Sequence, residues 1–96
     1  MNLPARSDIM VRNMILGQLR TGDVRDERVL AAMQTVPRER FLPENLQGAA
    51  YVDEDLETHP GRYLMAPLTF ARLLALAEIS ESSRVLVVGA LNGYPA

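Results

Sequence analysis

The run of four apolar residues at 85–88, within RVLVVGALNGYPA, constrains the fold more than any other feature of the sequence. Consecutive apolar residues rich in β-branched side chains are typical of a central parallel strand that is covered on both faces. A parallel neighbour requires a crossover of about a dozen residues or more, and too few residues follow Val88 to supply one. We therefore expect an interrupted sheet, unless the strand pairs with a hairpin of this chain or with a second copy. An unpaired strand edge favours association.

Composition narrows the class of protein. A chain of 96 residues with 48% hydrophobic and 23% charged residues is typical of one small globular domain. A net charge of −2 gives no general attraction to nucleic acid or anionic lipid, so we expect no nucleic-acid or membrane partner. The absence of cysteine excludes disulfides and thiolate metal sites and fits a cytoplasmic protein.

The first half of the chain is predicted to be helical. A helix over 5–20 is weakened at Gly17, because glycine is a poor helix former. A second helix begins at Asp23 or Asp26, either of which can cap it, and ends before Pro37.

Shorter elements follow in the second half. We expect brief helical turns over 38–42 and 43–48, and then two extended runs within 50–65 joined by a turn at His59-Pro60-Gly61. Pro67 suits the first turn of a helix that is apolar almost all round, which predicts burial on most sides.

Several motifs together resemble one enzyme family. The stretch GQLRTGDVRDERVLAAMQTVPRERFLPENLQGAAYVDEDL is similar to the N-terminal region of the protein-L-isoaspartate O-methyltransferases, with NQLR, DERVLEAM, VPRxxFVP and AYxD in the same order. RVLVVGALNGY resembles that family's RVLEIGTGSGY at the right distance downstream. The resemblance covers nearly the whole chain.

The resemblance implies an α/β fold. Residues 1–80 would form an N-terminal helical and flap region, and residues 81–96 the first strand and glycine turn of a Rossmann-like methyltransferase domain that is incomplete in this chain. Intact members use S-adenosylmethionine to methylate isoaspartyl carboxyl groups of damaged proteins or peptides, which begins their repair.

The resemblance also assigns a cofactor-binding turn to Gly89, Asn92 and Gly93. Glycines allow close approach of a backbone to a cofactor at the carboxyl end of a strand. Leu91 replaces the family's middle glycine and brings a Cβ where a positive φ is expected, and Val87 replaces an acidic residue. Without the family context, the same glycines are those of an ordinary turn.

A substrate flap is assigned in the same way to Arg62, Tyr63 and Met65. The family has GQTIS ahead of a proline where this chain has GRYLMAP, so Tyr63 replaces a threonine and Met65 a serine. A thioether cannot donate the hydrogen bond of a serine hydroxyl. The alternative, which we favour from the residues alone, is a hairpin strand with Tyr63 and Met65 directed into the core.

Other polar groups receive a structural interpretation. The cluster Asp53, Glu54, Asp55, Glu57 and His59 lacks the glycine and terminal glutamate of a calcium loop, so we assign a solvated loop and no metal. Arg38 and Arg40 are expected to form local ion pairs with neighbours such as Glu39 and Glu44. No hydrolase triad or phosphate-binding loop is recognisable.

The leading hypothesis is the N-terminal portion of a protein-L-isoaspartate O-methyltransferase-like protein, inactive and without bound S-adenosylmethionine when alone. The alternative is a non-enzymatic helical interaction module that forms a homo-oligomer through its unpaired strand.

Overall fold

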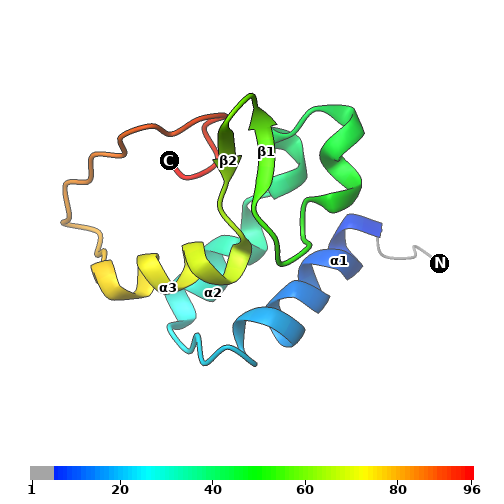
Figure 1. Ribbon diagram of the computed structural model, residues 1–96. Helices are drawn as coiled ribbons and strands as arrows, with labels where there is room; N and C mark the ends of the chain where they lie inside the picture. The colour runs from blue at the N-terminus through cyan, green and yellow to red at the C-terminus, as the bar shows by residue number, and fades with distance from the viewer. Residues whose placement is uncertain (1–5) are drawn as a thin grey trace.

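Helices and one hairpin make up the regular structure of residues 6–96. The computed structural model describes residues 6–96, and Figure 1 shows the helices arranged around the hairpin. The elements in chain order are α1 (Arg6–Met14), the π-helix η1 (Ile15–Leu19), α2 (Glu27–Thr35), the 3₁₀-helices η2 (Arg38–Phe41) and η3 (Glu44–Ala49), β1 (Leu56–His59), β2 (Arg62–Leu64) and α3 (Pro67–Ala77). The described part of the chain is therefore a mixed α/β structure.

The first helix changes its winding around Gly17. After α1 the backbone continues as η1, and the Arg20 amide donates to the Ile15 carbonyl, five residues back, at 3.0 Å. A π-turn of this kind is a local widening of a helix, and it confirms the predicted weak point. The predicted start of the helix at residue 5 lies outside the described residues.

Asp26 caps α2. Its Oδ1 accepts a hydrogen bond from the Arg28 amide at 3.0 Å, whereas Asp23 adopts φ 66° in the preceding turn. Of the two candidate caps, Asp26 is the correct one. The helix ends at Thr35 because Val36 is extended, as expected for a residue before a proline.

The predicted hairpin is present but shorter than expected. β1 and β2 are antiparallel, Leu56 lies opposite Leu64, and Gly61 takes φ 72° in the turn. Residues 50–55 form turns instead of an extended run. The base of the hairpin is closed by the Ala66 amide, which donates to Asp55 Oδ1 at 2.8 Å.

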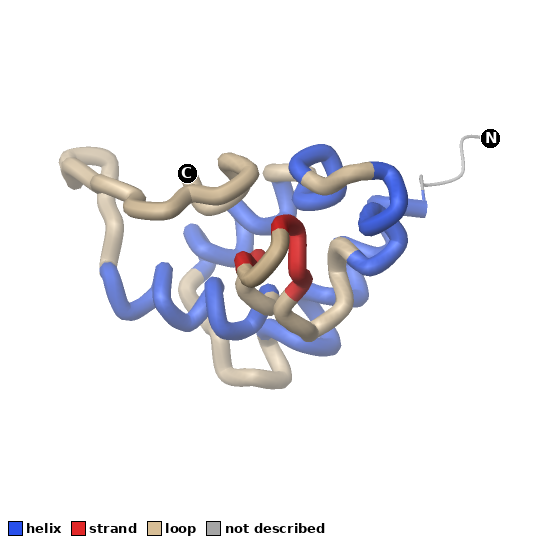
Figure 2. The backbone as a smooth tube through the Cα atoms, turned by 45° about the horizontal axis from the view of Figure 1, so that its top comes forward, coloured by secondary structure: helices blue, strands red, loops and turns tan. Residues whose placement is uncertain are grey.

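One core serves the helices, the hairpin and the C-terminal segment. Figure 2 shows the hairpin among the helices, with the C-terminal segment folding back beside it. The most buried members of the core include Met14, Leu19, Met33, Tyr51, Leu64, Ala71 and Tyr94.

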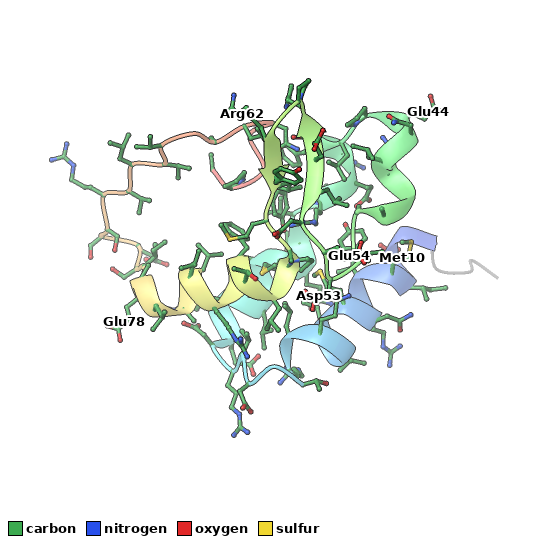
Figure 3. All side chains as sticks on the ribbon, viewed as in Figure 1. Met10, Glu44, Asp53, Glu54, Arg62 and Glu78 are labelled. Atoms are coloured by element: carbon green, nitrogen blue, oxygen red, sulfur yellow. The ribbon has the colours of Figure 1, made fainter. Side chains whose placement is uncertain are left out.

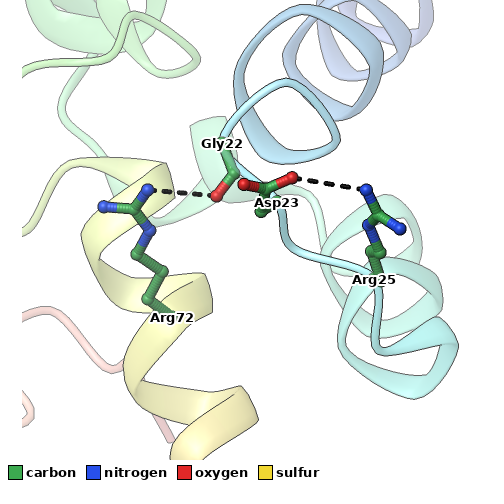
Figure 4. A network of polar contacts seen from close by, with 4 residues as sticks. All are labelled: Gly22, Asp23, Arg25 and Arg72. Atoms are coloured by element: carbon green, nitrogen blue, oxygen red, sulfur yellow. Dashed lines mark hydrogen bonds and ion pairs between the residues drawn. The ribbon is translucent and has the colours of Figure 1, made fainter.

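Polar contacts attach α3 to the turn that follows η1. Arg72 Nη2 donates to the Gly22 carbonyl at 3.0 Å, and Arg25 pairs with Asp23 at 3.4 Å in the same turn (Figure 4). A Cβ on Gly22 would stand 2.5 Å from Leu68 Cδ1 of α3 and 2.9 Å from the Gln18 carbonyl oxygen, so a larger residue here would force both to shift.

The predicted strand at 85–88 is wrong for the chain alone. Residues 85–87 have no regular secondary structure and Val88 lies in a turn, and Val85, Leu86, Val87 and Val88 are 57%, 86%, 37% and 86% exposed. Backbone groups of a strand need a neighbouring strand, and the only sheet among residues 6–96 is the hairpin, which leaves this segment unpaired.

The predicted burial of α3 on most sides is also wrong. Pro67 and Ala71 are buried, but Leu73 and Leu76 are 50% and 80% exposed. The helix packs against α2 and η1, and its Leu73 and Leu76 lie on a side that the described residues leave exposed. None of the helices within residues 6–96 is long and apolar enough to cross a membrane.

Candidate functional site

The glycine turn combines three residues with positive φ. Gly89, Leu91 and Gly93 take φ 71°, 58° and 93°. A Cβ at Gly89 would have no heavy atom within 4 Å, so the backbone there is open to an approaching ligand. Leu91 therefore does occupy a position of positive φ, which costs a residue with a Cβ about 1–2 kcal/mol.

Asn92 and Tyr94 attach this turn to η2. Asn92 Nδ2 donates to the Phe41 carbonyl at 2.7 Å, and its Oδ1 accepts from the Tyr94 amide at 3.2 Å. Tyr94 is 6% exposed, with its ring centroid 5.7 Å from those of Phe41 and Phe70. Both amide atoms of Asn92 are thus engaged in holding the turn.

The expectation that Tyr63 and Met65 point into the core is wrong. Their side chains are 56% and 36% exposed, while Leu64 between them is 2% exposed. Side chains alternate across a strand, so the packing of Leu64 beside Leu56 places its two neighbours on the opposite face. Because Tyr63, Leu64 and Met65 are all apolar or aromatic, the sequence alone does not show which of them faces the core.

All three predicted flap residues are exposed on the hairpin, with Tyr63 and Met65 on the face opposite Leu64. Arg62 lies at the turn end of the hairpin, away from the helices (Figure 3). Tyr63 is paired in register with Glu57, and hydrogen bonding to that carboxylate raises the pKa of the Tyr63 phenol. The flap therefore presents an aromatic, a thioether and a cationic side chain to its surroundings.

Arg38 links the hairpin to the glycine turn. It is 0% exposed; its Nε donates to the Ala50 carbonyl at 2.5 Å and its Nη2 to the Met65 carbonyl at 2.6 Å. Its guanidinium carbon lies 5.0 Å from the centroid of the Tyr94 ring. Burial lowers the pKa of Arg38.

The expected ion pairs of Arg38 are replaced by backbone contacts. Glu39 accepts a hydrogen bond from the Tyr51 hydroxyl, which in turn accepts from the Arg38 amide at 3.0 Å. Sequence reasoning took Arg38 as structural but missed that it is buried, because a single arginine in a charged stretch is normally solvated. Arg40 is exposed, and the expected ion pair with Glu39 or Glu44 is absent among the described residues.

The structure brings together some of the predicted site residues and separates others. Met65, at the base of the flap, and Tyr94, beside Gly93, lie on two sides of the Arg38 guanidinium. Arg62 lies at the far end of the hairpin. Asp53 and Glu54 are exposed below the hairpin, and Asp55 is used to close its base.

Comparison with known proteins decides the family. The profile of the protein-L-isoaspartate(D-aspartate) O-methyltransferases matches residues 10–96, which include both the hairpin and the glycine turn. The chain belongs to this family.

Curated relatives agree with the family assignment. Proteins named protein-L-isoaspartate O-methyltransferase from Opitutus terrae and Methanosarcina mazei are 40% and 48% identical, over 88% and 78% of this chain and 36% and 31% of their own lengths. One from Picosynechococcus is 36% identical over the whole chain and 46% of its own length. The chain therefore spans about a third to a half of the relatives it matches.

Members of this family use S-adenosylmethionine and act on proteins with isoaspartyl residues. The described residues are compatible with one wall of a cofactor site, because the backbone at Gly89 is open and Gly89 and Gly93 adopt positive φ values. Asn92 does not fit a cofactor ligand in this arrangement, because Phe41 and Tyr94 occupy its amide.

Proposed function

We propose that this chain supplies the substrate flap and the first cofactor-binding turn of an S-adenosylmethionine-dependent protein-L-isoaspartate O-methyltransferase. The observation that supports this most strongly is the match of the family profile across both segments. Structural support comes from Arg38, a buried arginine that contacts both the flap, at the Met65 carbonyl, and the turn, at the Tyr94 ring.

Each segment has a proposed task. The cofactor supplies the methyl group that the acceptor carboxylate receives. Gly89 and Gly93 let the backbone of the turn approach the cofactor, and Asn92 holds the turn in shape. The exposed side chains of Arg62, Tyr63 and Met65 contact the protein or peptide acceptor, orient it and exclude water.

We further propose that residues 85–88 become a strand of a Rossmann-like sheet when the rest of such a domain is present. The division at 80/81 then separates the flap region from that domain. Without the sheet, the open turn lacks the other walls of a cofactor crevice, so the chain alone neither binds S-adenosylmethionine nor transfers methyl groups. We place this protein in the cytoplasm, in keeping with its lack of cysteine.

A chimera tests the proposed activity. Residues 10–96 replace the matching region of the Methanosarcina mazei relative, and methyl incorporation is measured with an isoaspartyl peptide and with its aspartyl counterpart. We expect methylation of the isoaspartyl peptide only. A folded chimera that methylates neither peptide, while the parent relative does, contradicts the proposal.

The exposed segment 85–88 favours a second candidate function, a homo-oligomerisation module. Four neighbouring apolar side chains, each at least 37% exposed, are an edge that a second copy can cover. Size-exclusion chromatography with light scattering should then show concentration-dependent association that Leu86→Lys abolishes. A monomer at all concentrations rules this function out.

A further inference from the structure

Arg38 is held by groups from three separate parts of the chain. The guanidinium donates to the carbonyls of Ala50, which follows η3, and of Met65, at the base of the hairpin. A guanidinium is planar and its donors form a rigid fork, so two hydrogen bonds fix the plane of the group. The position of the Met65 carbonyl is therefore tied to the orientation of Arg38.

The same guanidinium supports the glycine turn. The Tyr94 ring lies on it at 5.0 Å, an arrangement that attracts a cation to the face of the ring. The turn is also bonded to η2, the element that carries Arg38, through Asn92 and the Phe41 carbonyl. The same guanidinium therefore contacts both the Tyr94 ring and the Met65 carbonyl.

Burial makes the orientation of Arg38 depend strongly on its contacts. Arg38 is 0% exposed and its Nη1 has no hydrogen-bond partner among the described residues. A buried charge depends on each of its remaining contacts, because water cannot replace a contact that is lost. A displacement of Tyr94 would therefore alter the contacts of Arg38, which also holds the Met65 carbonyl.

We propose that Arg38 is a positioning residue that couples the substrate flap to the cofactor turn, so that a displacement of the turn at Tyr94 is transmitted to the flap at Met65. The coupling itself is a property of the residues described above. Its bearing on methyl transfer rests on the proposed function.

The test measures the environment of the flap in variants that alter Tyr94 in the glycine turn. In the 96-residue chain with ¹³C-methyl methionine, the Met65 methyl resonance and the hydrogen exchange of the Ala66 amide report on the base of the flap. Tyr94→Leu removes the ring from Arg38 but keeps an apolar side chain, and Tyr94→Phe keeps the ring. Arg40→Gln is the matched control, since it removes an exposed arginine of the same 3₁₀-helix.

We expect Tyr94→Leu to shift the Met65 methyl resonance and to speed exchange at Ala66, beyond the changes in Arg40→Gln, and Tyr94→Phe to behave like the unchanged protein. In an Arg38→Lys background, the response to Tyr94→Leu should disappear, because an ammonium cannot reproduce the planar fork. If Arg38→Lys does not fold, the comparison of the two Tyr94 variants decides the matter alone.

Two results overturn the proposal. The first is an unchanged Met65 resonance in Tyr94→Leu while Phe41 and Phe70 resonances shift. The second is an equal flap response in the Arg38→Lys background, which would mean that another route carries it. Neither result bears on methyl transfer by the chimera, so failure of the coupling is distinguishable from failure of the proposed function.

Discussion

Replacing Tyr94 by alanine should show that the C-terminal segment belongs to the core. Tyr94 is 6% exposed and contacts two aromatic rings and the Arg38 guanidinium. Truncation of a buried aromatic side chain to alanine costs about 3–5 kcal/mol. We expect the low end of this range, about 3 kcal/mol, because the neighbouring side chains can collapse into part of the cavity.

This loss is large for a chain of this size. Small domains unfold with a free energy of about 5–15 kcal/mol, so Tyr94→Ala removes a substantial share of it. In urea, with an m-value of about 1–2 kcal/mol/M, the unfolding midpoint measured by far-ultraviolet circular dichroism should fall by about 1.5–3 M.

A matched control lies in the same segment. Leu86 is 86% exposed, so Leu86→Ala should change the free energy of unfolding by less than about 0.5 kcal/mol. Equal midpoints for the Tyr94→Ala and unchanged proteins would refute the reasoning, since they would mean that the segment does not dock through this ring.

Three further predictions concern stability. Asp26→Ala removes the cap of α2 and should lower the free energy of unfolding by about 1 kcal/mol in urea titrations, whereas Asp26→Asn should retain most of it. Glu78 ends α3 at φ 50°, so Glu78→Gly should raise the thermal midpoint through a gain of about 1 kcal/mol, and a lower midpoint would contradict the strain. Burial raises the pKa of Tyr51 and of Tyr94, so these phenols ionise in the unfolded chain before they ionise in the folded one, and the free energy of unfolding should fall as the pH rises above about 10. Tyr51→Phe should reduce this fall, and a free energy of unfolding that does not change at alkaline pH would refute the reasoning.

Local signals in the sequence predicted the short elements well. The Asp26 cap, the weak point at Gly17, the stop before Pro37 and the turn at Gly61 each depend on backbone chemistry within a few residues. Such signals act on neighbouring residues, so they hold in this chain without reference to the rest of a domain.

Non-local features could not be predicted in the same way. The run at 85–88 has the pattern of a buried strand, but no partner strand is present among the described residues to satisfy its backbone. The exposed Leu76 of α3 has the same cause. Apolar patterning indicates which surfaces are suited to burial, but it does not show whether another part of the structure packs against them.

The candidate site was predicted through family resemblance and not through its contacts. The sequence could place Gly89 and Gly93 in a turn. The contact of Tyr94 with Arg38 joins residues 56 positions apart, and no repeating pattern in the sequence indicates it. Likewise, the orientation of Tyr63 followed from which face Leu64 buries, and that depended on packing.

Calorimetric titration with S-adenosylmethionine tests most directly whether this chain supplies the first cofactor-binding turn. We predict saturable heat for the folded chimera that carries residues 10–96 and heat no different from buffer for the 96-residue chain alone. A folded chimera that gives no binding heat, while the Methanosarcina mazei relative binds the cofactor, would contradict the assignment of this turn.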